Sequence, residues 1–217
     1  MNFDQARANM VEQQIRPWEV LDQAVLDLLY AVPREDFVPS AYRTLAFADM
    51  EIPIGEGEKM MAPKIEARIV QEVAPRKHER VLEVGTGSGY LTALLAHRAA
   101  HVHSVEIRPA LAAFGRGNLE RHGADNVTLE IGDAARGWGG GAKYDVIVLT
   151  GSTPVLPVAF QNSLNVGGRL FAIVGDAPVM EASLITRVAA DKFETVNIME
   201  ACVAPLQNAL QPERFVF

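Results

Sequence analysis

From residue 80 onwards, short apolar runs alternate regularly with segments of helical spacing. The apolar runs predict five strands, at 80–84, 101–106, 126–131, 144–149 and 168–174. The segments between them predict helices at 88–98, 109–121 and 155–163, with a glycine-rich loop that runs through Gly141. Strands that alternate with helices of about ten residues pair in parallel through right-handed βαβ crossovers. We therefore expect a doubly wound, mostly parallel α/β sheet.

The two ends of the chain carry different patterns. Apolar spacing predicts helices at 3–14, 21–31 and 64–74, with an irregular, turn-rich region at 40–63. After the last parallel strand, the pattern predicts antiparallel edge strands at 183–190 and 194–206 and an extended end, Gln211–Phe217. We expect one domain over 1–217, in which residues 1–75 form an N-terminal helical cap with a loop region and residues 76–217 form the α/β core.

Composition narrows the class of protein. The chain has 217 residues, of which 49% are apolar, so one domain can bury a sizeable core and wholesale disorder is excluded. Its formal net charge of −7 argues against a broad electrostatic grip on nucleic acid or on an anionic membrane. No apolar run reaches membrane-spanning length, and the N-terminus lacks the basic-then-apolar pattern of a signal peptide. We expect a cytoplasmic protein that binds neither nucleic acid nor membrane; the pattern leaves the oligomeric state open.

Cysteine and histidine residues suggest no metal centre. Cys202 is the one cysteine, so an internal disulfide is impossible, which is typical of a reducing compartment. Its apolar neighbours favour a packed small side chain over a nucleophile. His97, His101 and His103 lie close in sequence but lack a clustered set of cysteine or carboxylate partners. We therefore expect no bound metal.

The segment from 81 to 90 carries the strongest chemical signal. It places Glu83 near the end of an apolar strand and then glycines at three alternating positions, Gly85, Gly87 and Gly89. Glycine tolerates positive φ and lets the backbone approach a ligand, while the following helix N-terminus presents unpaired N–H groups. A dinucleotide-binding turn has its third glycine three residues after the second, whereas here Tyr90 occupies that position. The alternative is a tight turn without a ligand.

A carboxylate closes the second strand of the predicted sheet. Glu106 lies at its end, and Ile107 follows it into the loop. Ligands of open parallel sheets bind beyond the carboxyl ends of the strands, where an acidic residue often accepts hydrogen bonds from ribose hydroxyls. We predict this role for Glu106, with a helix cap or a solvated side chain as the alternatives.

Two later strand ends face the same edge of the sheet. Asp133 and Ala134 close the third strand, where a side-chain or backbone oxygen could accept a hydrogen bond from an adenine amino group; a Gly-Asp pair is also an ordinary turn. The segment 150–154 closes the fourth strand and would line a reaction chamber. The more ordinary role for Ser152 or Thr153 is to cap the next helix.

Several segments together resemble the protein-L-isoaspartate O-methyltransferase family. The resemblance covers roughly residues 20–206 and rests on Val-Pro-Arg-Glu-Asp-Phe-Val-Pro (32–39), Ile-Pro-Ile-Gly-Glu-Gly (52–57), Val-Leu-Glu-Val-Gly-Thr-Gly-Ser-Gly-Tyr (81–90), Val-Glu (105–106), Asn-Val (126–127), Gly-Asp (132–133), Gly-Trp (137–138), Tyr-Asp (144–145), Gly-Gly-Arg-Leu (167–170) and Val-Gly (174–175). It implies a Rossmann-like methyltransferase fold and S-adenosylmethionine-dependent methylation of the free carboxylate of isoaspartyl residues in damaged protein. The cofactor residues that it implies are Glu83, Gly85, Thr86, Gly87, Gly89, Glu106, Ile107, Asp133 and Ala134.

The sequence departs from this family at the substrate loop. The family carries a Gln-Thr-Ile-Ser-x-Pro run, whose hydroxyls contact the substrate carboxylate, and the matching residues here are Glu-Lys-Met-Met-Ala-Pro (58–63). Lys59 replaces the threonine and could pair with a carboxylate or a phosphate. Met61 replaces the serine and would favour an apolar acceptor. Alternatively, Lys59 points to solvent, and Met60 and Met61 pack against the cap helices. The altered loop also leaves two other functions open: a methyltransferase with another acceptor, either a small molecule or a protein, and a cofactor-binding protein with little catalysis in which Met61 plugs the acceptor site.

Overall fold

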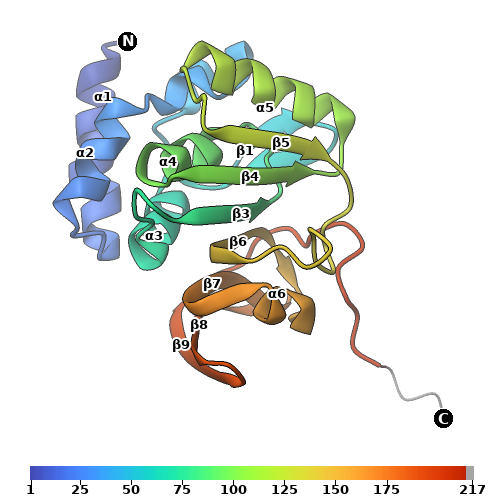
Figure 1. The fold of residues 1–217 in the computed structure, drawn as a ribbon. Helices are drawn as coiled ribbons and strands as arrows, with labels where there is room; N and C mark the ends of the chain where they lie inside the picture. The colour runs from blue at the N-terminus through green and yellow to red at the C-terminus, as the bar shows by residue number, and fades with distance from the viewer. Residues whose placement is uncertain (214–217) are drawn as a thin grey trace.

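The computed structural model describes residues 1–213, so the last four residues of the expected extended end lie outside the described part. Its centre is a seven-stranded sheet (Figure 1). In spatial order the strands are β5 (Val127–Ile131), β4 (His101–Glu106), β3 (Arg80–Val84), β6 (Tyr144–Thr153), β7 (Leu164–Asp176), β8 (Val179–Ala189) and β9 (Lys192–Glu200). β5, β4, β3, β6 and β7 pair in parallel, whereas β8 and β9 are antiparallel. The expected doubly wound fold with antiparallel edge strands is confirmed.

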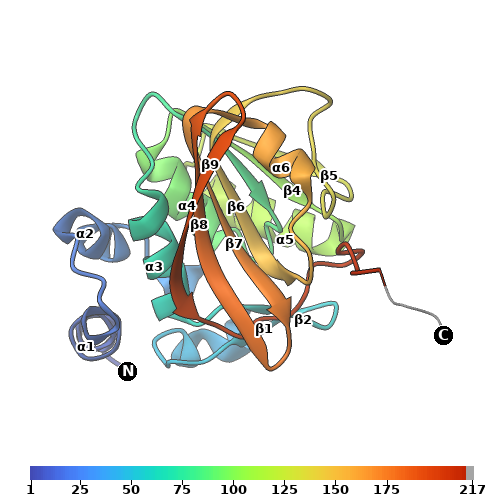
Figure 2. The same ribbon diagram turned by 90° about the horizontal axis from the view of Figure 1, so that it is seen from below.

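Helices cover both faces of the sheet. One face carries α3 (Pro63–Val73), α4 (Tyr90–Arg98) and α5 (Pro109–Arg121), and the other carries the short α6 (Val158–Asn162) (Figure 2). Because successive strand residues point to opposite faces, Val81 joins the first hydrophobic cluster while its neighbour Leu82 joins the second. This two-sided burial explains why the parallel strands are continuous apolar runs in the sequence.

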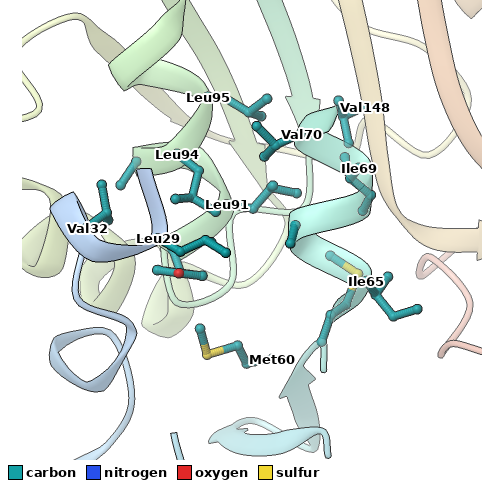
Figure 3. Close-up of a cluster of buried hydrophobic side chains, with 14 of the residues drawn as sticks. Leu29, Val32, Met60, Ile65, Ile69, Val70, Leu91, Leu94, Leu95 and Val148 are labelled. Atoms are coloured by element: carbon teal, nitrogen blue, oxygen red, sulfur yellow. The ribbon is translucent and has the colours of Figure 1, made fainter. Parts of the chain in front are cut away.

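An N-terminal cap packs outside the first helical layer (Figure 1). It consists of α1 (Phe3–Met10), a π-helical turn (Val11–Ile15), a 3-10 turn (Arg16–Trp18) and α2 (Gln23–Ala31), followed by 3-10 turns at Arg34–Asp36 and Ser40–Leu45. Side chains from the cap, from α3 and from α4 meet in one buried cluster (Figure 3). Within residues 1–213, no helix has the length and apolar character needed to cross a membrane.

Several boundaries differ from the sequence-based expectation. The turn-rich region 40–63 contains a small antiparallel hairpin, β1 (Ile52–Gly55) and β2 (Glu58–Met60). β6 continues to Thr153, because Ser152 and Thr153 pair with β7, so the prediction that either residue caps the next helix is wrong. α6 begins only at Val158, with Pro157 as its N-cap residue, because proline restricts the backbone before it.

Candidate active site

A cleft runs along the carboxyl ends of the parallel strands. It holds about 820 Å³ of empty space, part of which is open to solvent. Its walls come from the hairpin region, the ends of β3, β4 and β5, the end of β6 and a C-terminal segment: Glu51, Ile54, Glu58, Lys59, Met61, Val84, Gly85, Gly87, Val105, Glu106, Ile107, Arg108, Leu111, Gly132, Asp133, Ala134, Ala135, Thr150, Gly151, Val203, Ala204, Pro205, Leu206 and Gln207. The position matches the general rule for ligands of open α/β sheets, because β3 lies between β4 and β6, where the strand order reverses.

The glycine turn connects β3 to α4 in a conformation that only glycine adopts readily. Gly85, Gly87 and Gly89 have φ values of 98°, 54° and 81°. A Cβ atom at Gly85 would lie 2.1 Å from the Thr150 Oγ1 atom, so the turn packs directly against the end of β6. The Thr150 hydroxyl donates to the carbonyl oxygens of Val84 and Gly85 at 2.8 and 3.0 Å, which fixes the start of the turn.

A further glycine supports the turn from below. Gly115 lies inside α5, and a Cβ atom there would lie 2.9 Å from the Gly87 carbonyl oxygen and 3.0 Å from a methyl group of Thr86. Glycine in a helix interior costs about 0.5–1 kcal/mol relative to alanine, so its presence needs a reason. The close approach of α5 to the turn provides that reason, which the sequence pattern alone does not show.

Glu106 links the end of β4 to the glycine turn. Its side chain is 5% exposed. Its Oε2 atom accepts the Gly87 backbone N–H at 2.9 Å, and its Oε1 atom accepts the Arg108 backbone N–H at 3.0 Å. Each carboxylate oxygen accepts two hydrogen bonds, so both atoms retain capacity for donors in the cleft.

Glu83 lies beneath the turn rather than in the cleft wall. It is fully buried, and its Oε2 atom accepts hydrogen bonds from the hydroxyls of Thr92 and Ser104. The Ser104 hydroxyl also lies 2.6 Å from that of Thr86, so a buried polar network supports the turn. Burial raises the pKa of Glu83 to about 7, against the lowering effect of the two hydroxyls.

A C-terminal segment forms a further wall of the cleft. The backbone N–H of Leu206 donates to the Ser152 carbonyl oxygen at 2.9 Å, which fixes residues 203–207 beside the end of β6. Asp133 accepts the Ala135 backbone N–H at 3.0 Å and the Asn208 side-chain amide at 2.8 Å. Asp133 therefore connects the end of β5 to the C-terminal segment.

The opposite end of the cleft is formed by the hairpin. Lys59 Nζ lies 3.1 Å from Glu51 Oε2, and the two side chains are 54% and 35% exposed. Arg108 binds Glu58 Oε1 through both Nε and Nη2, at 2.9 and 2.7 Å. The Met61 side chain is buried and lines the cleft. Hence each cation at this end already has a carboxylate partner.

The sequence-predicted residues divide into two groups. Lys59, Met61, Gly85, Gly87, Glu106, Ile107, Asp133 and Ala134 line the cleft. Glu83, Thr86 and Gly89 lie outside its lining and shape the turn from behind. No motif marks Glu51, Arg108 or the wall 203–207, so these residues could not be predicted from the sequence. They reach the cleft only through the tertiary fold.

The histidines lie away from this cleft. His103 Nε2 is 3.1 Å from Glu130 Oε1, and the Trp138 indole Nε1 donates to the same nitrogen at 3.3 Å. His101 Nε2 lies 2.9 Å from the Thr128 hydroxyl. Within residues 1–213, no group of three or more His, Cys, Asp or Glu side chains has a geometry that could hold a metal ion.

Comparison with solved structures first defines the fold. A Plasmodium falciparum protein, solved in complex with S-adenosyl-L-homocysteine, superposes with a TM-score of 0.79 at 19% identity, covering 95% of this chain and 99% of that chain. The chain therefore shares the fold of that protein, a mostly parallel sheet with helices on both faces.

Sequence comparison then defines the family. The family model of protein-L-isoaspartate(D-aspartate) O-methyltransferase matches residues 5–211. A protein-L-isoaspartate O-methyltransferase of Methanoculleus marisnigri is 40% identical over 201 residues, 92% of this chain and 90% of that protein. A protein-L-isoaspartate O-methyltransferase 2 of Marinobacter nauticus is 37% identical, covering 92% of each. The chain belongs to this family of S-adenosylmethionine-dependent methyltransferases, which confirms the resemblance.

Proposed function

We propose that this protein transfers a methyl group from S-adenosylmethionine to the free carboxylate of isoaspartyl residues in proteins or peptides. The observation that supports this proposal is a single cleft. Its lining includes the glycine turn, Glu106 and the two positions, Lys59 and Met61, that match the family's substrate loop. A cofactor and an acceptor can therefore meet in one space.

The cofactor end of the cleft fits a nucleoside. The glycine turn lacks side chains that would fill the space, and Glu106 has free acceptor capacity toward the cleft, suited to two ribose hydroxyls. Asp133 and the backbone of Ala134 would accept or donate at the base edge, and Ile107 would contact the base. When bound, S-adenosylmethionine supplies an electrophilic methyl group on a sulfonium. The residues of the chain hold that group in place and keep water away.

The acceptor end needs alignment rather than proton transfer. An isoaspartyl carboxylate is already ionised at neutral pH, so no strong general base is required. The main contribution to rate is then to hold a carboxylate oxygen in line with the methyl group. We assign this binding role to Lys59, whose ammonium group can replace the missing hydroxyl donors once it leaves Glu51.

A second function is favoured by Met61. Its buried side chain occupies the position at which the family places a hydroxyl, so it makes this part of the wall apolar. We infer from this that isoaspartyl turnover is slow, and that a methyltransferase with a less polar acceptor, or a cofactor-binding protein with little catalysis, is the alternative.

One assay separates these functions. Purified protein and radiolabelled S-adenosylmethionine are incubated with an isoaspartyl peptide and, as the control, with the same peptide containing a normal aspartyl residue. The proposal predicts a methyl ester on the isoaspartyl peptide alone, and a higher rate in the double variant Lys59→Thr/Met61→Ser. Labelling of other components of a cell extract without ester on the peptide would favour the second acceptor. Saturable cofactor binding without any labelling would favour the binding protein.

A further inference from the structure

A charged side chain is completely buried between the cap and the cleft. Arg34 begins the 3-10 turn that follows the cap helices, within the Val-Pro-Arg-Glu segment, and its side chain is 0% exposed. Burying a charge is costly unless the group is paired and hydrogen-bonded. Neither the cofactor end nor the acceptor end of the cleft, as described above, uses this residue, so its burial needs an explanation.

The Arg34 guanidinium contacts four separate segments. Its Nη2 donates to the Met61 carbonyl oxygen at 2.6 Å, and its Nε donates to the Ala46 carbonyl oxygen at 2.9 Å. Its Nη1 forms an ion pair with Glu66 of α3. Its Cζ lies over the Tyr90 ring, 5.2 Å from the ring centroid. The Arg34 guanidinium therefore links Ala46, Met61, Glu66 and Tyr90.

One of these partners lines the cleft, and another adjoins the glycine turn. Met61, whose main-chain carbonyl is held, is also the residue whose side chain lines the acceptor end. Tyr90 directly follows Gly89, the last glycine of the turn. The guanidinium is rigid and bonds in fixed directions, so it sets the distance between the partners more tightly than a lysine would.

We propose that Arg34 is a positioning residue, which fixes the Met61 wall of the cleft relative to the glycine turn. It reaches the cleft only through the backbone of Met61 and the ring of Tyr90, and it need not touch the acceptor. The expected displacement of Met61 is independent of the proposed methylation, whereas the expected change in KM rests on it. Loss of Arg34 should release the Met61 backbone, so that the Met61 side chain takes up several positions in the cleft. The KM for the acceptor should then rise, because the acceptor binds well to only some of these positions.

The chain provides a matched control. Arg169 of β7 also pairs with a glutamate, Glu79, and also donates to two main-chain carbonyls, those of Val73 and Ala74 at the end of α3. None of these four residues lines the cleft. Arg169→Lys therefore removes the same kind of interaction at a place where no effect on the cleft is expected.

The experiment compares Arg34→Lys with Arg169→Lys in the full-length protein. Methionine methyl groups are labelled with 13C, and the Met61 signal is assigned by its loss in Met61→Leu. We expect the Met61 signal to shift or broaden in Arg34→Lys, with Met180 and Met199 unchanged, and to stay in place in Arg169→Lys. An unchanged Met61 signal in folded Arg34→Lys overturns the proposal.

Kinetics and folding complete the test. With an isoaspartyl peptide, Arg34→Lys should raise the acceptor KM about tenfold, the size expected from a 1.4 kcal/mol loss of alignment, while the Kd for S-adenosylhomocysteine changes less than twofold. If wild type forms no ester, the proposed function fails and the methionine signals still decide the role of Arg34.

If Arg34→Lys does not fold, the uncharged pair Arg34→Met/Glu66→Met replaces it. Failure of both to fold, with Arg169→Lys folded, would mean that Arg34 serves stability alone and would overturn the proposal.

Discussion

Glu106 offers the sharpest test of the cofactor site. Its two oxygens accept the backbone N–H groups of Gly87 and Arg108, each can accept one further hydrogen bond, and the residue lines the cleft. Substitution Glu106→Ala removes the acceptors proposed for the ribose hydroxyls. It also releases Gly87, so the turn loses one of its attachments.

The loss of cofactor affinity expected in Glu106→Ala can be estimated from the hydrogen bonds that are removed. Hydrogen bonds to a charged group contribute about 1.5–3 kcal/mol each in net terms. Since about 1.4 kcal/mol corresponds to a factor of ten, loss of one such bond weakens binding about tenfold to a hundredfold. Release of Gly87 adds to this effect, whereas water that enters the space reduces it. We therefore expect the Kd for cofactor to rise by one to two orders of magnitude.

Isothermal titration calorimetry with S-adenosylhomocysteine measures this directly, because the demethylated product does not turn over. Glu130→Ala is the matched control: it removes a glutamate from the neighbouring strand β5, which pairs with His103 and lies outside the cleft lining. Thermal unfolding shows whether each variant is folded. A Kd within twofold of wild type in folded Glu106→Ala would refute the ribose assignment.

Three further predictions concern the turn, its buried acid and the acceptor end. In α5, Gly115→Ala should weaken S-adenosylhomocysteine binding and lower the free energy of unfolding, because the new Cβ would collide with the glycine turn. Gly117→Ala is the control: its Cβ meets only the flexible end of the Arg121 side chain at 3.7 Å, so it should raise the free energy of unfolding in urea by up to about 1 kcal/mol. Equal changes in binding and stability for the two variants would show that Gly115 is not needed for packing against the turn. Burial raises the folded-state pKa of Glu83 to about 7 from its ordinary 4.5, so the stability it contributes is fully present below pH 4.5 and is lost as the pH rises through 7. Glu83→Gln should remove this loss, about 3 kcal/mol in the free energy of unfolding between pH 4.5 and 8, and an unchanged pH profile would argue against it. Glu51→Gln, which frees Lys59, should lower the KM for an isoaspartyl peptide by up to about fivefold, as expected for an exposed ion pair. Asp49→Asn, which breaks the nearby Lys64–Asp49 pair outside the cleft, should leave the KM unchanged. If the two variants have the same KM, Glu51 does not compete with the substrate carboxylate for Lys59.

The central sheet and the glycine turn at its edge could be predicted from the sequence, for a physical reason. Parallel strands such as 144–149 are buried on both faces, so their apolar runs are visible without any knowledge of the partners. The glycine turn is equally local, because the required positive φ values demand glycine at fixed spacing. Glu106 follows from its strand, since the end of a parallel strand must lie at the same edge as the turn.

The parts that the sequence did not predict depend on contacts distant in the chain. β1 and β2 are short and contain proline or lie next to glycines, so they have the composition of a loop and form strands only by pairing with each other. The end of β6 is held by residues 203–207, some fifty positions later. Arg34 and Glu66 have the charges of surface residues, and only the fold shows that they neutralise each other inside the protein.

The last prediction rests on the charges at the proposed acceptor end of the cleft, where Lys59 takes a position that matches a hydroxyl residue of the family. Two carboxylates and two cations line it and are already paired, so an arriving carboxylate meets no free positive charge and must exchange an existing pair. The Arg108–Glu58 pair has two contacts, whereas Lys59–Glu51 has one contact and is more exposed, so the lysine is the cation that is released more easily. An exposed pair contributes about 0–1 kcal/mol, which is small beside the attraction for a well-placed substrate. If Lys59 binds the acceptor as proposed, Glu51 sets how strongly a carboxylate must bind before Lys59 can hold it, and acceptor selection at this loop depends on the Lys59–Glu51 pair.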